Sequence, residues 1–167
     1  VIQSFYEENP FPNYEDVDSA WSLTEKAEKG ILARLLDEQI PHGSRVLEVG
    51  CGTGQLSNFL GIRWGRTVFG TDISVNSLKL GQGFKQQNQI DNVIFVQMNL
   101  FRTVFRPESF DLVICNGVLH HTSDPFGGFR WYVPSFWWRV SGRLGCHMNH
   151  LRELFFFDLI QWLLHCP

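Results

Sequence analysis

The chain has 167 residues, of which 44% are hydrophobic, and its formal net charge at pH 7 is −3. This length suits one domain, and this apolar content excludes a disordered chain. A charge so close to neutral gives no electrostatic reason to bind nucleic acid, so no nucleic-acid partner is expected.

The four cysteines show no Cys-x-x-Cys pair and no regular spacing; they are Cys51, Cys115, Cys146 and Cys166. Neither a metal site nor a disulfide framework is therefore expected. Cys51 and Cys115 lie in apolar or glycine-rich runs, where a reduced cysteine acts as a small hydrophobic residue. Reduced cysteines favour a cytoplasmic location.

Residues 1 to about 20 contain prolines, aromatic residues and acids without periodicity, which indicates an arm lying against the domain. They lack the basic-then-apolar order of a signal peptide. Ser22-Leu23-Thr24-Glu25 has the pattern of a capping box, and apolar residues then recur at helical spacing, so one helix is expected before Pro41. Residues 1–41 are predicted to form an N-terminal arm and helix.

From residue 42 the chain alternates strand and helix patterns. Near-continuous apolar strands that alternate with helices are typical of a parallel sheet covered on both faces. Residues 42–130 are therefore predicted to form a Rossmann-like α/β core with a mostly parallel sheet and helices on both faces. The predicted strands are Arg45–Val49, Thr67–Thr71, Val93–Val96 and Phe110–Cys115, and the predicted helices are 55–62 and 75–88.

A glycine-rich run, Glu48-Val49-Gly50-Cys51-Gly52-Thr53-Gly54, joins the first of these strands to the helix after it. Open α/β sheets bind ligands at such strand ends. Glycines here permit φ > 0 and let a ligand approach the backbone. The alternative is an ordinary tight turn between a strand and a helix.

Asp72 ends the second predicted strand, 22 residues after Gly50. An acid at this distance and at this strand end accepts hydrogen bonds from ribose hydroxyls. The alternative is an aspartate that caps the following helix, a role that Ser74 is also able to fill.

The order of glycines argues against a dinucleotide. The third glycine of G-x-G-x-x-G would stand at position 55, which is Gln55, and the chain holds no phosphate loop of the G-x-x-x-x-G-K-[ST] type. Glu48 would repel a pyrophosphate but would suit a cationic ligand across the loop. The sequence favours a cofactor without phosphates.

Three ordered motifs resemble the class I S-adenosylmethionine-dependent methyltransferases. They are Val46-Leu47-Glu48-Val49-Gly50-Cys51-Gly52-Thr53-Gly54, Gly70-Thr71-Asp72-Ile73-Ser74, and the run Phe110-Asp111-Leu112-Val113-Ile114-Cys115-Asn116-Gly117-Val118-Leu119-His120-His121 followed by Asp124-Pro125. The resemblance covers about residues 43–129. The opening Phe5-Tyr6 and Pro10-Phe11-Pro12-Asn13-Tyr14 is similar to an arm in some bacterial members.

The resemblance implies that S-adenosyl-L-methionine is the cofactor and that the strand ends bind it. Asp72 would hold the ribose diol, Ile73 would pack on the adenine, and Asn99, where the family usually has Asp, would accept from the adenine amino group. Asn116 and Leu119 would approach the methionine end. The remaining residues of the implied cofactor set are Glu48, Gly50 and Gly52, for the methionine and ribose part, together with Cys51, Gly54 and Leu100.

His120 and His121 are the candidate catalytic residues. They lie at the rim where a methyl acceptor should bind, and histidine suits proton removal near neutral pH. The alternative is that one or both are packing or helix-start residues. The expected acceptor is a small molecule.

The pattern of the family changes after Arg130. Its fold has a seven-stranded sheet, whereas residues 131–167 show no such continuation, so the sheet is expected to be incomplete and the tail truncated or translated out of frame. A lineage-specific tail that packs normally is the other interpretation. The apolar stretch at 154–164 is shorter than the roughly 20 residues that span a bilayer, so no membrane association is expected.

Three functions remain open from the sequence. The first is a methyltransferase that uses S-adenosylmethionine. The second is a nicotinamide-dependent oxidoreductase on the same fold, against which Gln55 and Glu48 argue. The third is a remnant that binds cofactor or folds without turnover.

Overall fold

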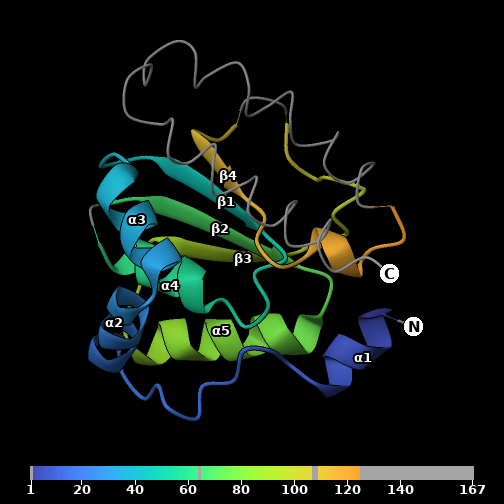
Figure 1. Ribbon diagram of the computed structural model, residues 1–167, viewed down its shortest axis with the longest axis horizontal. Coiled ribbons are helices and arrows are strands. Elements are labelled where there is room, and N and C mark those ends of the chain that lie inside the picture. Colours follow the sequence, from blue (N-terminus) through green and yellow to red (C-terminus); the bar gives the residue numbers. More distant parts are fainter. Residues whose placement is uncertain (1, 64, 107–108, 125–167) are drawn as a thin grey trace.

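A computed structural model describes residues 2–63, 65–106 and 109–124 (Figure 1). Four strands form one parallel sheet in the order β3-β2-β1-β4. The two central strands are joined in register from Arg45 opposite Thr67 to Val49 opposite Thr71. The strands are β1 (Arg45–Val49), β2 (Thr67–Asp72), β3 (Val93–Gln97) and β4 (Leu112–Ile114). The four predicted strands are confirmed, with β4 shorter than expected.

Five α-helices and one short 3₁₀ helix are present in the described residues. They are α1 (Ile2–Glu8), α2 (Ala20–Lys29), α3 (Ile31–Gln39), α4 (Gln55–Ile62), α5 (Val75–Gln87) and η1 (Leu119–His121). The predictions for α4 and α5 are confirmed to within one residue. Ser74 caps α5, because its side chain accepts a hydrogen bond from the Ser77 amide at 3.1 Å.

The N-terminal region differs from its prediction in three ways. The segment thought to be aperiodic contains α1. The single helix expected before Pro41 is two helices, because Gly30 adopts an extended conformation (φ −85°, ψ 127°). The capping box is formed by Ser19 and Ser22, each side chain accepting from the other's amide, so α2 begins three residues earlier than the pattern at Ser22 suggested.

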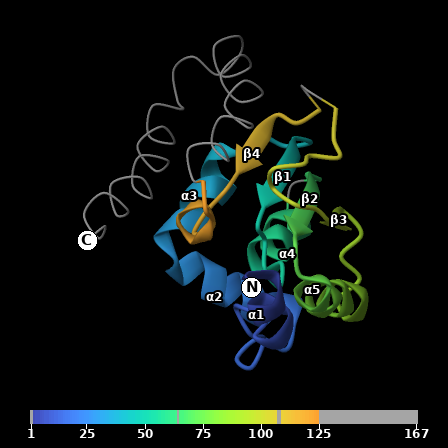
Figure 2. The ribbon, with the colours of Figure 1, turned by 90° about the vertical axis from the view of Figure 1, so that its right-hand side faces the viewer.

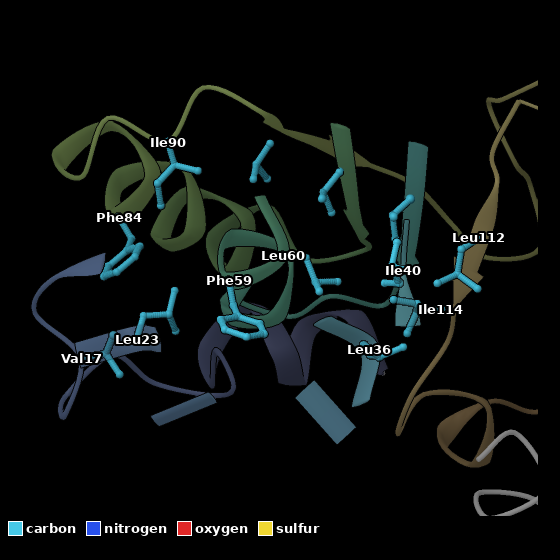
Figure 3. Packing of buried hydrophobic residues seen from close by; sticks show 13 residues of the cluster. Val17, Leu23, Leu36, Ile40, Phe59, Leu60, Phe84, Ile90, Leu112 and Ile114 are labelled. Atoms are coloured by element: carbon cyan, nitrogen blue, oxygen red, sulfur yellow. The ribbon is translucent and has the colours of Figure 1, made fainter. Parts of the chain in front are cut away.

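One face of the sheet packs against α2, α3, α4 and α5. Side chains from the four strands and these helices share one buried cluster, in which Phe59 and Leu60 are fully buried (Figure 3). Burying side chains of this size stabilises a fold by about 1.5–3 kcal/mol each. Because Leu23 of α2 and Leu36 of α3 belong to this cluster, the N-terminal helices share the hydrophobic core of the sheet.

The other face of the sheet carries a second cluster. Leu47, Val49 and Val113 point to this side and pack with Met98 and Phe110 from the connection between β3 and β4. Alternate residues of β1 thus lie on opposite faces, as expected for a strand buried on both sides. The Rossmann-like, mostly parallel α/β fold predicted from the sequence is confirmed, whereas in the described residues the second face is covered by the connection between β3 and β4 and not by the helices predicted there.

The carboxyl ends of all four strands meet at one edge of the sheet, since the strands are parallel. This edge faces α1 and η1 on the right of Figure 1, and Figure 2 views the molecule from that side. The core predicted for 42–130 is described up to residue 124, and the predicted tail, 131–167, lies outside the described residues.

Candidate functional site

The glycine-rich loop leaves β1 and enters α4 through three left-handed residues. Gly50, Gly52 and Gly54 have φ values of +72°, +54° and +74°. Side chains other than glycine rarely adopt this region, so the predicted need for φ > 0 is confirmed at all three positions.

Every amide of this loop donates to an acceptor of the protein itself. Gly50 and Cys51 donate to the carbonyl oxygen of Thr71 at 2.7 and 2.9 Å, and Gly54 donates to that of Cys51 at 2.9 Å. The Gly52 amide donates to Oδ2 of Asp72 at 2.9 Å, and the Thr53 amide to the carbonyl oxygen of Phe11 at 3.2 Å. None of these five amides is therefore left to receive a phosphate.

Protein atoms lie close to the glycines. A Cβ atom placed on Gly50 would lie 2.3 Å from Val118, one on Gly52 would lie 2.1 Å from the Phe11 carbonyl oxygen, and one on Gly54 would lie 2.3 Å from the Phe95 ring. The loop is thus enclosed by the N-terminal region, by the segment after β4 and by β3. Its glycines allow these close approaches within the protein.

Asp72 links the loop to the start of α5. While its Oδ2 accepts from Gly52, its Oδ1 accepts from the Ser74 amide at 2.9 Å. A carboxylate has about four lone-pair sites, so two remain for the hydroxyls of a ribose. The side-chain cap of α5 comes from Ser74, which leaves Asp72 to organise the loop.

Glu48 is a buried acid directly before the loop. It points to the face covered by α4, where Ser57 Oγ donates a hydrogen bond to its Oε2. The pKa of Glu48 is raised to about 7, mainly by burial and in smaller part by the nearby Asp72 carboxylate, while the hydrogen bonds from Ser57 act in the opposite direction. A cation beside this group would be stabilised, because an opposite charge favours the ionised acid.

Cys51 is buried in the loop. Burial raises the pKa of the thiol well above its usual value, and the carboxylates of Glu48 and Asp72 act in the same direction. A neutral thiol is a poor nucleophile. Burial and the two carboxylates thus favour the neutral thiol form of Cys51 over the nucleophilic thiolate.

The strand order brings the remaining predicted cofactor residues to the same edge. Ile73 and Leu100 are half-buried, and Asn99 is exposed with its Oδ1 accepting from the Phe101 amide at 2.9 Å. That bond occupies one of the two lone pairs of the Asn99 oxygen and leaves one for an adenine amino group. After β4, Asn116 is exposed and Leu119 is half-buried.

The two candidate catalytic histidines lie in η1, at the same edge. The ring of His121 packs edge-on against Tyr6 of α1, with 6.4 Å between centroids and an interplanar angle of 71°. For His120 the structure describes the backbone only. The 3₁₀ helix thus brings the histidine pair next to the N-terminal helix, a contact that the sequence did not reveal.

The arm predicted to lie against the domain contains the N-terminal strap, defined here as residues 2–14, whose individual contacts with the glycine loop the sequence did not reveal. Besides the Phe11 contact, Thr53 Oγ1 donates to the carbonyl oxygen of Pro12, and the Tyr14 hydroxyl donates to that of Thr53 at 3.0 Å. Gln55 Nε2 donates to the carbonyl oxygen of Asn13 at 2.6 Å. The cluster of aromatic residues and prolines in this segment was the only sequence signal for these contacts.

The site does not suit a dinucleotide. A pyrophosphate needs free amides at a glycine loop, whereas these amides are occupied and two carboxylates, Glu48 and Asp72, lie beside them. A cationic cofactor with a ribose and no phosphate fits the same groups. The hollow of about 660 Å³ beside Arg66 lies at the opposite end of the strands and includes none of the predicted site residues.

In the residues that the structure describes, no helix is long and apolar enough to cross a bilayer.

Comparisons with known proteins support the kind of cofactor that this geometry favours. A family described as a methyltransferase domain matches residues 47–130, half of the chain. A ubiquinone biosynthesis O-methyltransferase of Paracidovorax citrulli is 36% identical over 84 residues, which cover 50% of this chain and 35% of that protein. The match therefore spans about a third of the length of this curated relative.

Two solved structures have related folds. The YcgJ protein of Bacillus subtilis has a TM-score of 0.54 at 25% identity, covering 59% of this chain and 42% of that protein. The [4+2]-cyclase SpnF has a TM-score of 0.65 at 18% identity, covering 81% of this chain and 55% of that one. The second likeness shows the fold alone. The family match decides the identity: the chain belongs to the methyltransferase domain family, in the class I group that uses S-adenosylmethionine.

Proposed function

We propose that the protein transfers a methyl group from S-adenosylmethionine to a small-molecule acceptor. The observation that carries the proposal is the glycine loop, whose amides are occupied while the carboxylates of Glu48 and Asp72 lie at its two sides. This arrangement suits a ligand with a positive charge and a ribose. Membership of the methyltransferase domain family supports the same cofactor.

Each residue of the set has an assigned part in the proposal. The free lone pairs of Asp72 accept from the ribose hydroxyls, and Ile73 packs beside the adenine, whose amino group donates to Asn99 Oδ1. Glu48 places its charge near the methionine ammonium group. The backbone of Gly50, Cys51, Gly52 and Gly54 and the side chains of Leu100, Asn116 and Leu119 complete the walls.

The cofactor supplies an activated methyl group on a sulfonium sulfur. The protein's contribution is then to hold the acceptor in line with that group and to exclude water, because a well-aligned near-attack geometry lowers a reaction barrier by up to about 7–11 kcal/mol. His121, and His120 beside it in η1, would remove a proton from an acceptor hydroxyl. The position of η1 at the carboxyl edge supports this role.

A small-molecule acceptor is supported by two observations. The curated relatives include ubiquinone biosynthesis O-methyltransferases, whose name indicates a hydroxyl acceptor. The chain carries a net charge of −3, which gives no electrostatic attraction to a nucleic acid.

Isothermal titration with S-adenosylmethionine and, separately, with NAD tests the cofactor. Saturable binding of S-adenosylmethionine alone is expected, binding of NAD alone would overturn the proposal, and binding of neither would favour a remnant. Transfer of radiolabelled methyl groups to a panel of phenols then tests turnover. Binding of the cofactor without transfer to any phenol would exclude a phenolic hydroxyl as the acceptor.

A further inference from the structure

Glu7, in the last turn of α1, binds the first turn of α5, although 68 residues separate it from Val75 in the chain. Its Oε1 accepts from the Val75 amide and its Oε2 from the Asn76 amide, both at 2.9 Å. Ser74 Oγ donates to Oε2 at 3.2 Å. These bonds hold the pKa of Glu7 below its usual value, the two backbone amides having the largest effect.

Backbone contacts strengthen this attachment. Asn76 Nδ2 donates to the carbonyl oxygen of Glu7 at 3.0 Å, and Ser74 Oγ also lies 3.1 Å from that of Tyr6. Figure 1 shows α1 beside the end of α5 that lies next to the carboxyl edge of the sheet. The first turn of α5 is therefore bound both by its own cap and by α1.

A short relay connects this attachment to the glycine loop. Ser74, which Glu7 contacts, donates its amide to Oδ1 of Asp72, and Oδ2 of Asp72 accepts from Gly52. The position of the Asp72 carboxylate thus depends on where the first turn of α5 is held. Carboxylates bound by two backbone amides are well oriented, because charge-assisted hydrogen bonds are the strongest kind.

The strap continues from α1 to the other side of the same loop. There the carbonyl oxygen of Phe11 accepts from Thr53, and Tyr14 donates to the carbonyl oxygen of Thr53. Neither end of the strap takes the lone pairs of Asp72 that are assigned to the ribose. The strap therefore holds the walls of the site in place and leaves those binding atoms available.

We propose that Glu7 is a positioning residue for the cofactor site. By binding the first turn of α5 it fixes Ser74, and through Ser74 it orients Asp72 and Gly52. Docking of α1 and binding of the cofactor then reinforce each other. The identity of the ligand in this proposal rests on the proposed function. The relay from Glu7 through Ser74 and Asp72 to Gly52 rests only on the contacts described above.

The test compares Glu7→Gln with Glu8→Gln, which removes the same charge from the neighbouring, exposed position of α1. Isothermal titration with S-adenosylhomocysteine is expected to give a dissociation constant about fivefold to tenfold higher for Glu7→Gln, less than the loss of a charged group that binds the ligand directly would cause, because Glu7 acts only through Ser74 and Asp72. Glu8→Gln should match the wild type. Equal affinity of the two variants would overturn the proposal.

Hydrogen exchange followed by mass spectrometry measures the relay without ligand. In Glu7→Gln, the peptide containing the Gly52 and Thr53 amides should exchange several times faster than in Glu8→Gln. Unchanged exchange in that peptide would refute the relay. If the wild type does not bind S-adenosylhomocysteine, the proposed function fails, and this measurement still decides the positioning role.

A second variant covers the case in which Glu7→Gln does not fold. Glu7→Asp keeps the charge near the start of α5 but shortens the reach of the carboxylate. It should give an affinity and an exchange rate between those of the wild type and of Glu7→Gln. Wild-type values for both quantities would contradict the geometry of the three bonds.

Discussion

Ser57 Oγ donates a hydrogen bond to Oε2 of Glu48, and both side chains are buried where β1 meets the first turn of α4. Ser57 stands three positions after the last glycine of the loop, so the turn from β1 into α4 places the Ser57 hydroxyl beside Glu48. The bond lowers the pKa of Glu48, but burial outweighs it and the net shift is upward. The acid is thus held ready for a nearby cation rather than neutralised by a fixed ion pair.

Glu48 should make the stability of the ligand-free protein fall as the pH rises. Its pKa is about 7 in the folded state against 4.5 for an ordinary glutamate, so between these values only the folded state keeps the proton. The free energy of unfolding should therefore drop between pH 4.5 and pH 7, by about 3 kcal/mol at 1.36 kcal/mol per pH unit.

The variant Glu48→Gln isolates this contribution. The pKa values of Glu7 and Asp18 are lowered in the folded state, and these two groups affect the pH dependence of the wild type and of the variant equally. Urea unfolding of the wild type and the variant at pH 5 and pH 8 measures it. The variant should gain stability relative to the wild type at pH 8. If the free energies of unfolding of the wild type and of the variant differ by the same amount at pH 5 and at pH 8, the raised pKa of Glu48 is contradicted.

Asp72→Asn should weaken binding of S-adenosylhomocysteine by about 10-fold to 100-fold, because hydrogen bonds to a charged group contribute about 1.5–3 kcal/mol. The change removes the charge that orients Gly52 and Ser74 and would accept the ribose hydroxyls. Isothermal titration gives the dissociation constant. Asp91→Asn, at an exposed position before β3, is the control and should bind as the wild type does.

Gly52→Ala should displace the strap, whereas Gly43→Ala should not. Both glycines have positive φ, +54° and +72°, so both variants lose about 1 kcal/mol to backbone strain. Only at Gly52 would the new Cβ lie 2.1 Å from the Phe11 carbonyl oxygen, while nothing lies within 4 Å at Gly43.

Chemical denaturation should therefore show at least about 1 kcal/mol more destabilisation for Gly52→Ala than for Gly43→Ala, as is typical when a packed site is overfilled. Faster exchange of the Thr53 amide, which donates to Phe11, should accompany it. Equal destabilisation of the two variants would mean that the strap does not rest on the loop.

Arg66→Met should destabilise the fold by about 3 kcal/mol, because it removes one partner of a buried ion pair. The guanidinium is 1% exposed and donates to Oδ1 of Asp37 at 2.7 Å and to the carbonyl oxygens of Asp37 and Ile40 at 2.6 and 2.8 Å. It thus joins the end of α3 to the start of β2.

Lys29→Met provides the comparison for Arg66. Lys29 pairs with Glu25 on the surface, with side chains 74% and 59% exposed. Such a pair contributes at most about 1 kcal/mol. Urea unfolding at pH 7 should separate the two variants clearly; similar losses would show that the Arg66 contacts are not a main support of α3.

The strands and the helices after residue 42 could be predicted from the sequence because their signals are local. Apolar runs mark β1 to β4, and the glycines at 50, 52 and 54 mark the turn. Once the strands are parallel, their carboxyl ends share one edge, so the sequence also placed Asp72 near the glycine loop. The family resemblance rested on these same local motifs.

Two errors of prediction concern the local conformation of the chain, and a third concerns a helix that distant contacts hold in place. At Gly30 an extended conformation interrupts a continuous helical pattern, and at Ser19 the cap lies before the pattern that suggested Ser22. α1 shows no strong period, and it is held by contacts with α5 and by the packing of its Tyr6 ring against His121 of η1. No local signal reports such contacts.

The sequence by itself determined the parallel strands, the left-handed turn and the acids that flank it, because these follow from periodicity and from the conformational range of glycine. Only the tertiary structure decided that Ser57 meets Glu48, that all five loop amides are occupied, and that Glu7 reaches the start of α5. The reason is physical: the Ser57–Glu48 bond spans 9 positions, the Gly52–Asp72 bond 20 and the Val75–Glu7 bond 68, and only the folding of the chain brings such residues within hydrogen-bonding distance.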